Sequence, residues 1–220
     1  ALGHNSLGLN TTGNSNVAVG RAALATATTA SNNTAVGDEA LLANTTATEN
    51  TGLGHQALKN NTTGTRNTAI GDQSLDANTT ASDNTGLGQF TLTSNTTGTE
   101  NTGVGQAALA VNVTGSQNTA VGNDALRNNT VSNNVAVGKS ALSVNTTGTP
   151  NLAIGNYSLD ANTTGAHNVA VGHEACSSIT TGNKHVGIGY RALYSGQTNS
   201  NNVGIGYEAL YANTGGSTMV

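Results

Sequence analysis

The chain has 220 residues, a net charge of −4, and only 8% charged and 3% aromatic residues. So little charge argues against solvated disorder, and so few aromatic residues argue against a conventional globular core. The mild net charge supplies no basic patch for nucleic acid, and the sequence holds no apolar run of about 18 residues that would span a membrane as a helix.

A repeat of 17 residues, such as Asn67–Asp83, organises the whole chain. Its leading Asn, here called position one, recurs at residues 16, 33, 50, 67, 84, 101, 118, 134, 151, 168 and 202, and His185 replaces it once. One interval, from Asn118 to Asn134, is 16 residues long. Self-similarity at a fixed short period predicts a solenoid.

Each copy begins with a short predicted strand, typified by Asn-Thr-Ala-Val-Gly. Position four is always aliphatic and position five is always Gly, which suits a corner. The residues taken as structural markers are Val36 and Ile70 at position four, and Gly37, Gly54, Gly71, Gly88, Gly105 and Gly122 at position five.

A second short strand is predicted around the Ala-Leu pair at positions eight and nine, where Leu58 and Leu75 stand. Cys176 replaces this Leu once and is expected to be a small buried apolar side chain. An Asn-Thr-Thr-Gly stretch then forms a second corner, because Asn tolerates left-handed backbone geometry and its amide can bond the turn.

Alternation along the first strand places positions two and four on one face and positions three and five on the other. We expect position four to point into the coil together with the Leu of position nine. Positions three and five are uniformly Ala or Gly, which suggests close approach of a neighbouring chain. A coil of 17 residues encloses little apolar volume, and this also favours oligomerisation.

The predicted fold is therefore all-β: a parallel β-solenoid of about a dozen coils that forms a single repeat domain over residues 1–220. The chain opens at position three of a coil, so we expect it to be a segment of a longer fibre.

The repeated motif resembles the head repeat of trimeric autotransporter adhesins. The resemblance covers the whole chain, and clear matches are Asn33–Gly37, Asn67–Gly71, Asn151–Gly155 and Asn168–Gly172. It implies a left-handed parallel β-roll in which three chains form the head. The added Asn-Thr-Thr-Gly corner departs from that family, and similar repeats occur in phage tail fibres and other extracellular fibres.

The leading hypothesis is a structural segment of an extracellular or virion surface fibre that serves adhesion, reach or assembly. We expect self-association as a homotrimer or filament, located outside the cell, at the cell surface or on the virion. A host surface, extracellular matrix or glycan is the candidate external partner. No titratable constellation recurs, so we expect no catalysis, no cofactor and no metal.

A binding module is the alternative hypothesis, with an ice-binding or glycan-binding face formed by rows of Thr at positions thirteen and fourteen or by ladders of Tyr. The candidate surface-binding residues are Tyr190, Tyr194, Tyr207 and Tyr211, and we expect each pair one coil apart to stack. Candidate glycosylation sites are Asn44, Asn61, Asn78, Asn95, Asn145 and Asn162, although turn chemistry and Asn ladders explain the same residues.

Overall fold

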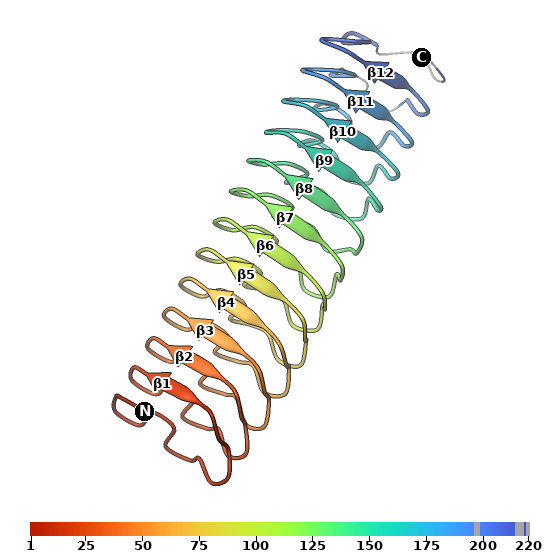
Figure 1. The fold of residues 1–220 in the computed structure, drawn as a ribbon. Coiled ribbons are helices and arrows are strands. Elements are labelled where there is room, and N and C mark those ends of the chain that lie inside the picture. The colour runs from red at the N-terminus through yellow and green to blue at the C-terminus, as the bar shows by residue number, and fades with distance from the viewer. Residues whose placement is uncertain (196–198, 214–217, 219–220) are drawn as a thin grey trace. The chain divides into compact units, whose positions relative to one another are not determined.

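The computed structural model describes residues 1–195, 199–213 and 218. Over these residues the chain is an all-β parallel β-solenoid of about 11 turns, each about 17 residues long (Figure 1). Each strand has three residues: β1 (Val17–Val19), β2 (Thr34–Val36), β3 (Thr51–Leu53), β4 (Thr68–Ile70), β5 (Thr85–Leu87), β6 (Thr102–Val104), β7 (Thr119–Val121), β8 (Val135–Val137), β9 (Leu152–Ile154), β10 (Val169–Val171), β11 (Val186–Ile188) and β12 (Val203–Ile205).

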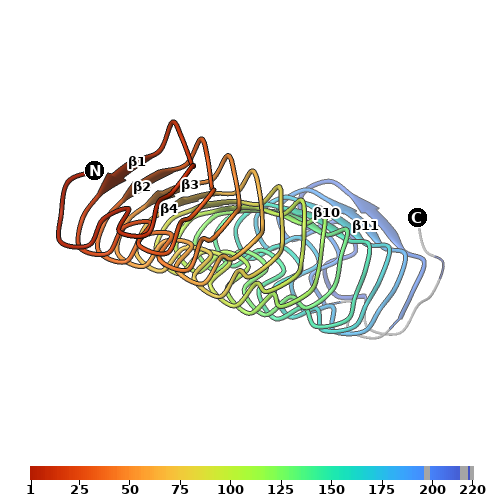
Figure 2. The ribbon, with the colours of Figure 1, turned by 90° about the horizontal axis from the view of Figure 1, so that it is seen from below.

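The coils fall into two compact units, Ala1–Thr114 and Gly115–Val220. Strands β1 to β6 pair in parallel and in chain order in the first unit, and β7 to β12 do the same in the second. In each unit the strands lie along one side of the coils (Figure 2). The register advances by one repeat per strand, and the pairing of Thr119 with Val135 absorbs the copy that is one residue short.

The second strand predicted at positions eight and nine is wrong, because that segment is a run of tight turns. In the copy that starts at Asn67, Gln73 and Leu75 both have a φ of 53°, in the left-handed region. Their amides still donate across coils, from Leu75 N to the Thr91 carbonyl at 3.0 Å and from Gln73 N to the His55 carbonyl at 2.9 Å. Hydrogen bonding between coils therefore continues through a segment that is not extended.

The predicted inward face of the first strand is also wrong. Ala69 at position three is fully buried, whereas Ile70 at position four is part-exposed, and this pattern holds along the strands. Leu75 at position nine is buried as expected. Position three must be small because the Leu of the preceding coil packs on it: a Cβ built on Gly52 would lie 3.3 Å from Leu41 Cγ.

Gly at position five is required by a close approach within the chain and not by a neighbouring chain. Gly71 has a φ of +132°, which side chains rarely adopt. A Cβ added there would lie 2.5 Å from the carbonyl oxygen of Gly88 in the next coil. The stacking distance between coils thus leaves no room for a methyl group at this corner.

Two ladders of buried Asn side chains connect successive coils. At position one, the Asn67 amide N–H donates to Asn50 Oδ1 at 2.9 Å, and Asn67 Nδ2 donates to the Ala81 carbonyl at 2.8 Å. At position twelve, Asn78 Nδ2 donates to Asn61 Oδ1 at 2.8 Å and to the same Ala81 carbonyl at 3.0 Å. These bonds satisfy polar groups that burial would otherwise leave unpaired.

The candidate glycosylation sites belong to the second ladder, where a sugar on the amide nitrogen would have to displace hydrogen bonds of the folded chain. Each side chain is fully buried, and each Nδ2 that would carry the sugar donates hydrogen bonds inside the coil. The residues concerned are Asn44, Asn61, Asn78, Asn95, Asn145 and Asn162. The turn and ladder explanation of these residues is confirmed.

Both ladders are interrupted near the same level of the second unit. Ile179 stands where position twelve is usually Asn, and Asn162 Oδ1 in the preceding coil is buried with no hydrogen-bond partner in the described part of the chain. His185 replaces Asn at position one. Its amide donates to Asn168 Oδ1 at 2.9 Å, and its Nε2 lies 2.8 Å from the Asn199 carbonyl. The ring's Nδ1 is buried and has no partner among the described residues.

We predict that His185 makes the fold less stable in acid. Burial lowers the pKa of His185 below its ordinary value of 6.5, while the hydrogen bond to Asn199 opposes that shift. The unfolded chain therefore binds a proton that the folded chain rejects, and stability falls as the pH drops below about 6.5, by up to about tenfold in the unfolding constant per pH unit.

The His185→Asn variant is expected to lose this dependence between pH 6.5 and the folded-state pKa, because Asn occupies position one in the neighbouring coils. Melting temperatures at pH 7.5 and at about pH 5 measure the effect. The matched control is His167→Asn, at an exposed position where Asn133 and Asn201 stand in other coils. If the pH dependence persists in His185→Asn but disappears in His167→Asn, then His167 causes the acid sensitivity and the prediction for His185 is wrong.

Candidate functional site

The outward strand face is the main candidate interaction surface. The first and third residue of each strand, at positions two and four, point away from the buried middle residue. Position four is aliphatic in all twelve strands, and Leu53, Leu87 and Ile154 are 42%, 43% and 38% exposed. Neither row carries a charged residue. The face is therefore an uncharged, partly exposed surface that carries one aliphatic side chain at position four in each coil.

Position two changes character along the chain. It is Thr in β2 to β7 and aliphatic in β1 and in β8 to β12. The aliphatic residues of β8 to β12 are Val135, Leu152, Val169, Val186 and Val203. In the second unit, the outward face of β8 to β12 thus has no hydroxyl in either row.

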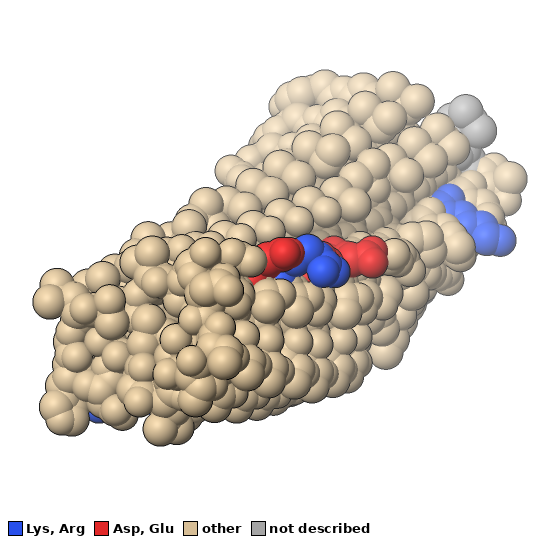
Figure 3. Space-filling model, turned by 60° about the horizontal axis from the view of Figure 1, so that its bottom comes forward, with Lys and Arg blue, Asp and Glu red and all other residues tan. Residues whose placement is uncertain are grey.

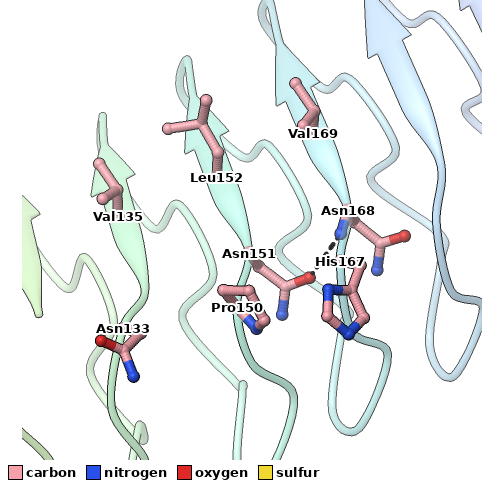
Figure 4. Close-up of a pocket in the computed structure, with 8 residues that line it drawn as sticks. All are labelled: Asn133, Val135, Pro150, Asn151, Leu152, His167, Asn168 and Val169. Atoms are coloured by element: carbon pink, nitrogen blue, oxygen red, sulfur yellow. Dashed lines mark hydrogen bonds between the residues drawn. The ribbon is translucent and has the colours of Figure 1, made fainter.

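A hollow of about 440 Å³ lies at the edge of this aliphatic face. Val135, Leu152 and Val169 project side by side from β8, β9 and β10, and the corner residues Pro150 and His167 lie below them (Figure 4). Asn133, Asn151 and Asn168 complete the lining. The hollow adjoins the copy that is one residue short. In that copy the corner is tighter, because Asn129 Nδ2 donates to the carbonyl of Val131, two residues later. In the next copy, Asn145 Nδ2 donates to the carbonyl of Gly148, three residues later.

Charged side chains pair from coil to coil on the corners. Arg66 donates to both carboxylate oxygens of Asp83, from Nε at 2.6 Å and from Nη2 at 2.9 Å. Lys59 Nζ lies 2.9 Å from Glu39 Oε2, and hydrogen bonds from Lys59, Gln56 and Arg21 lower the pKa of Glu39 to about 2. Acidic and basic side chains are adjacent on a surface that carries few others (Figure 3). The Arg66–Asp83 pair is exposed and therefore adds little stability.

The predicted Tyr ladders are confirmed in the second unit. The ring centroids of Tyr190 and Tyr207 are 5.3 Å apart and those of Tyr194 and Tyr211 are 5.0 Å apart, both stacked. The Arg191 guanidinium lies over the rings of Tyr190 and Tyr194, at 5.1 and 5.5 Å from their centroids. Stacking covers one face of each of these rings, and Tyr207, at 74% exposure, is the most accessible of the four.

The two Thr rows differ in what their hydroxyls do. At position thirteen, Thr62 and Thr163 donate to backbone carbonyls of the next coil at 3.0 and 3.1 Å. At position fourteen, Thr63, Thr80 and Thr164 are exposed, and no hydrogen bond from their hydroxyls is seen among the described residues. Only the second row is therefore available to order external water.

The remaining reactive groups are one thiol and scattered His, Asp and Glu side chains. Cys176 is fully buried at the Leu position, as expected, and burial raises the pKa of its thiol to about 12. In the part of the chain that the structure describes, no three His, Cys, Asp or Glu side chains are placed to share a metal ion. No helix of sufficient length and hydropathy to cross a membrane occurs in the described ranges.

No family model matches this chain, and no match was found among curated proteins or among solved structures.

We predict that Leu75 contributes far more to stability than Ile70. Truncating the fully buried Leu75 to Ala should cost about 2–5 kcal/mol. Ile70→Ala, on the outward face, should cost less than about 1 kcal/mol under dilute conditions. Urea midpoints of the two variants provide the measurement, and equal losses would contradict the observed orientation of the strand.

Proposed function

We propose that this chain is a structural segment of an extracellular or virion surface fibre and that its copies associate through their outward strand faces as a homotrimer. The observation that carries the proposal is the aliphatic row at position four, which is exposed or part-exposed in every strand of the described residues. Contiguous exposed apolar surface is characteristic of interaction sites.

A second copy of the chain is the partner that best fits this surface. The face presents a ridge at each strand, spaced by about 4.8 Å, the distance between paired strands. A partner can interlock with such a surface over many coils only if it has the same period, and another copy has it. The face is uncharged, so no ionic group of either copy would be desolvated by the contact.

The homotrimer and the surface location rest on the resemblance to trimeric autotransporter adhesin heads and to phage tail fibres, carried by motifs such as Asn67–Gly71. The left-handed sense of the coil stays a prediction from the same resemblance. The self-association that the sequence suggested at positions three and five is reassigned to positions two and four, because position three is buried in the coil and position five packs against the backbone of the next coil.

We predict that the purified chain associates reversibly and that Ile154→Asp abolishes association without unfolding the monomer. Ile154 is 38% exposed, so its replacement leaves the core intact while placing a charge in the contact. Sedimentation equilibrium gives the number of chains, and circular dichroism reports the fold. Thr80→Asp, on the exposed corner, is the control that should still associate. A wild-type chain that remains monomeric at every concentration would refute the proposal.

Ice binding is the second candidate function, favoured by the exposed Thr row at position fourteen. Thermal hysteresis of the purified chain tests it directly. If this row binds ice, the triple replacement of Thr46, Thr63 and Thr80 by Ser should abolish hysteresis, because the methyl groups are lost. Absence of hysteresis in the wild-type chain excludes this alternative and leaves the fibre proposal intact.

A further inference from the structure

The outward aliphatic residues of β8 to β12 form a surface distinct from the rest of the strand face. We name it the anchor patch: Val135, Leu152, Val169, Val186 and Val203 at position two, with Val137, Ile154, Val171, Ile188 and Ile205 at position four. We propose that self-association is anchored by this patch and that the hollow beside Leu152 receives apolar side chains of the second copy. This inference rests on the proposed function, and it specifies which part of the chain contributes most to the association between copies.

The cost of removing water from the outward face differs between the strands that carry Thr at position two and those of the anchor patch. In β2 to β6 of the first unit, every second outward side chain is Thr, and no hydrogen bond from those hydroxyls is seen within the described residues. Covering them with an apolar surface would remove their water without replacing it, which is unfavourable. In the anchor patch both rows are aliphatic, so the same contact removes only apolar area from water.

The hollow provides the second, independent observation. It is about 440 Å³ and is bounded on one side by Val135, Leu152 and Val169 and on the other by Pro150. Side chains of three neighbouring strands, Val135, Leu152 and Val169, line the hollow together, so it opens at the strand face (Figure 4). If a second copy covered the patch and left this volume empty, the lining side chains would lose packing contacts. A filled hollow is therefore expected.

The border of the patch has the composition of an interface rim. The corner residues that precede its strands are Asn133, His167, Lys184 and Asn201, all exposed, with Pro150 between them. Apolar centres surrounded by polar, solvent-accessible rims are typical of protein interfaces. None of the corner residues directly before the strands of the anchor patch is acidic.

Natural variation between the copies supplies a conservative test. Thr stands at position two in β2 to β7, so the coil accepts Thr there without loss of the fold. The triple variant Val135→Thr, Leu152→Thr, Val169→Thr should therefore remain folded. Its association should weaken by at least about 30-fold in Kd, since each replacement substitutes a hydroxyl for buried apolar surface. Sedimentation equilibrium measures Kd, and circular dichroism checks the fold.

The matched control is Thr51→Ser, Thr68→Ser, Thr85→Ser in the first unit, which should leave Kd within about threefold. The inference would be overturned if the control weakened association as much as the anchor-patch variant does. It would also be overturned if the anchor-patch variant folded and its Kd were unchanged. If the wild-type chain does not associate at all, the proposed function fails first, and this is a distinguishable result.

A filling variant tests the hollow by itself. Val135→Phe places a ring at the hollow from β8. If a second copy occupies the hollow, the ring should compete with it and weaken association about tenfold. If the hollow stays empty, the added apolar area should tighten association, and that result would overturn the assignment of the hollow.

Discussion

The close stacking of one coil on the next is the constraint on which the rest of this structure depends. At position five the backbones approach so closely that a Cβ on Gly71 would lie 2.5 Å from the Gly88 carbonyl oxygen. That approach brings position-one and position-twelve Asn side chains within hydrogen-bond distance of their counterparts one repeat away. It also forces position three to be Ala or Gly, since Leu from the preceding coil occupies the remaining interior space.

The repeat, the parallel β-solenoid and the stacking of Tyr190 on Tyr207 could be predicted, because each follows from the period alone. The inward face could not. Alternation separates the strand into two faces, but in so narrow a coil the apolar face is not necessarily the inner one. Ala69 is interior because Leu75 and its equivalents already fill the centre, and no local pattern reports that competition. The left-handed backbone conformation of Leu75 could not be predicted either, because a Leu side chain gives no indication of a positive φ.

The consequence is an inversion of the usual distribution of polar and apolar groups. Amide side chains such as Asn67 and Asn78 are fully buried, while aliphatic side chains such as Ile154 lie on the outside. The buried amides are satisfied by the next coil, so their polarity does not oppose folding. Among the described residues the outer aliphatic rows have no comparable partner, and the proposed self-association would supply one.

The identical register from strand to strand also bears on how such a chain changes length over generations. Because Thr68 meets Thr85 in the same way that Thr51 meets Thr68, removal or duplication of one whole copy through unequal recombination recreates contacts that already exist. Gene segments of this kind can therefore lengthen or shorten without passing through an unfolded product. The copy between Asn118 and Asn134 shows that a copy one residue shorter is also accommodated, since the tighter corner before Asn133 restores the register at Val135.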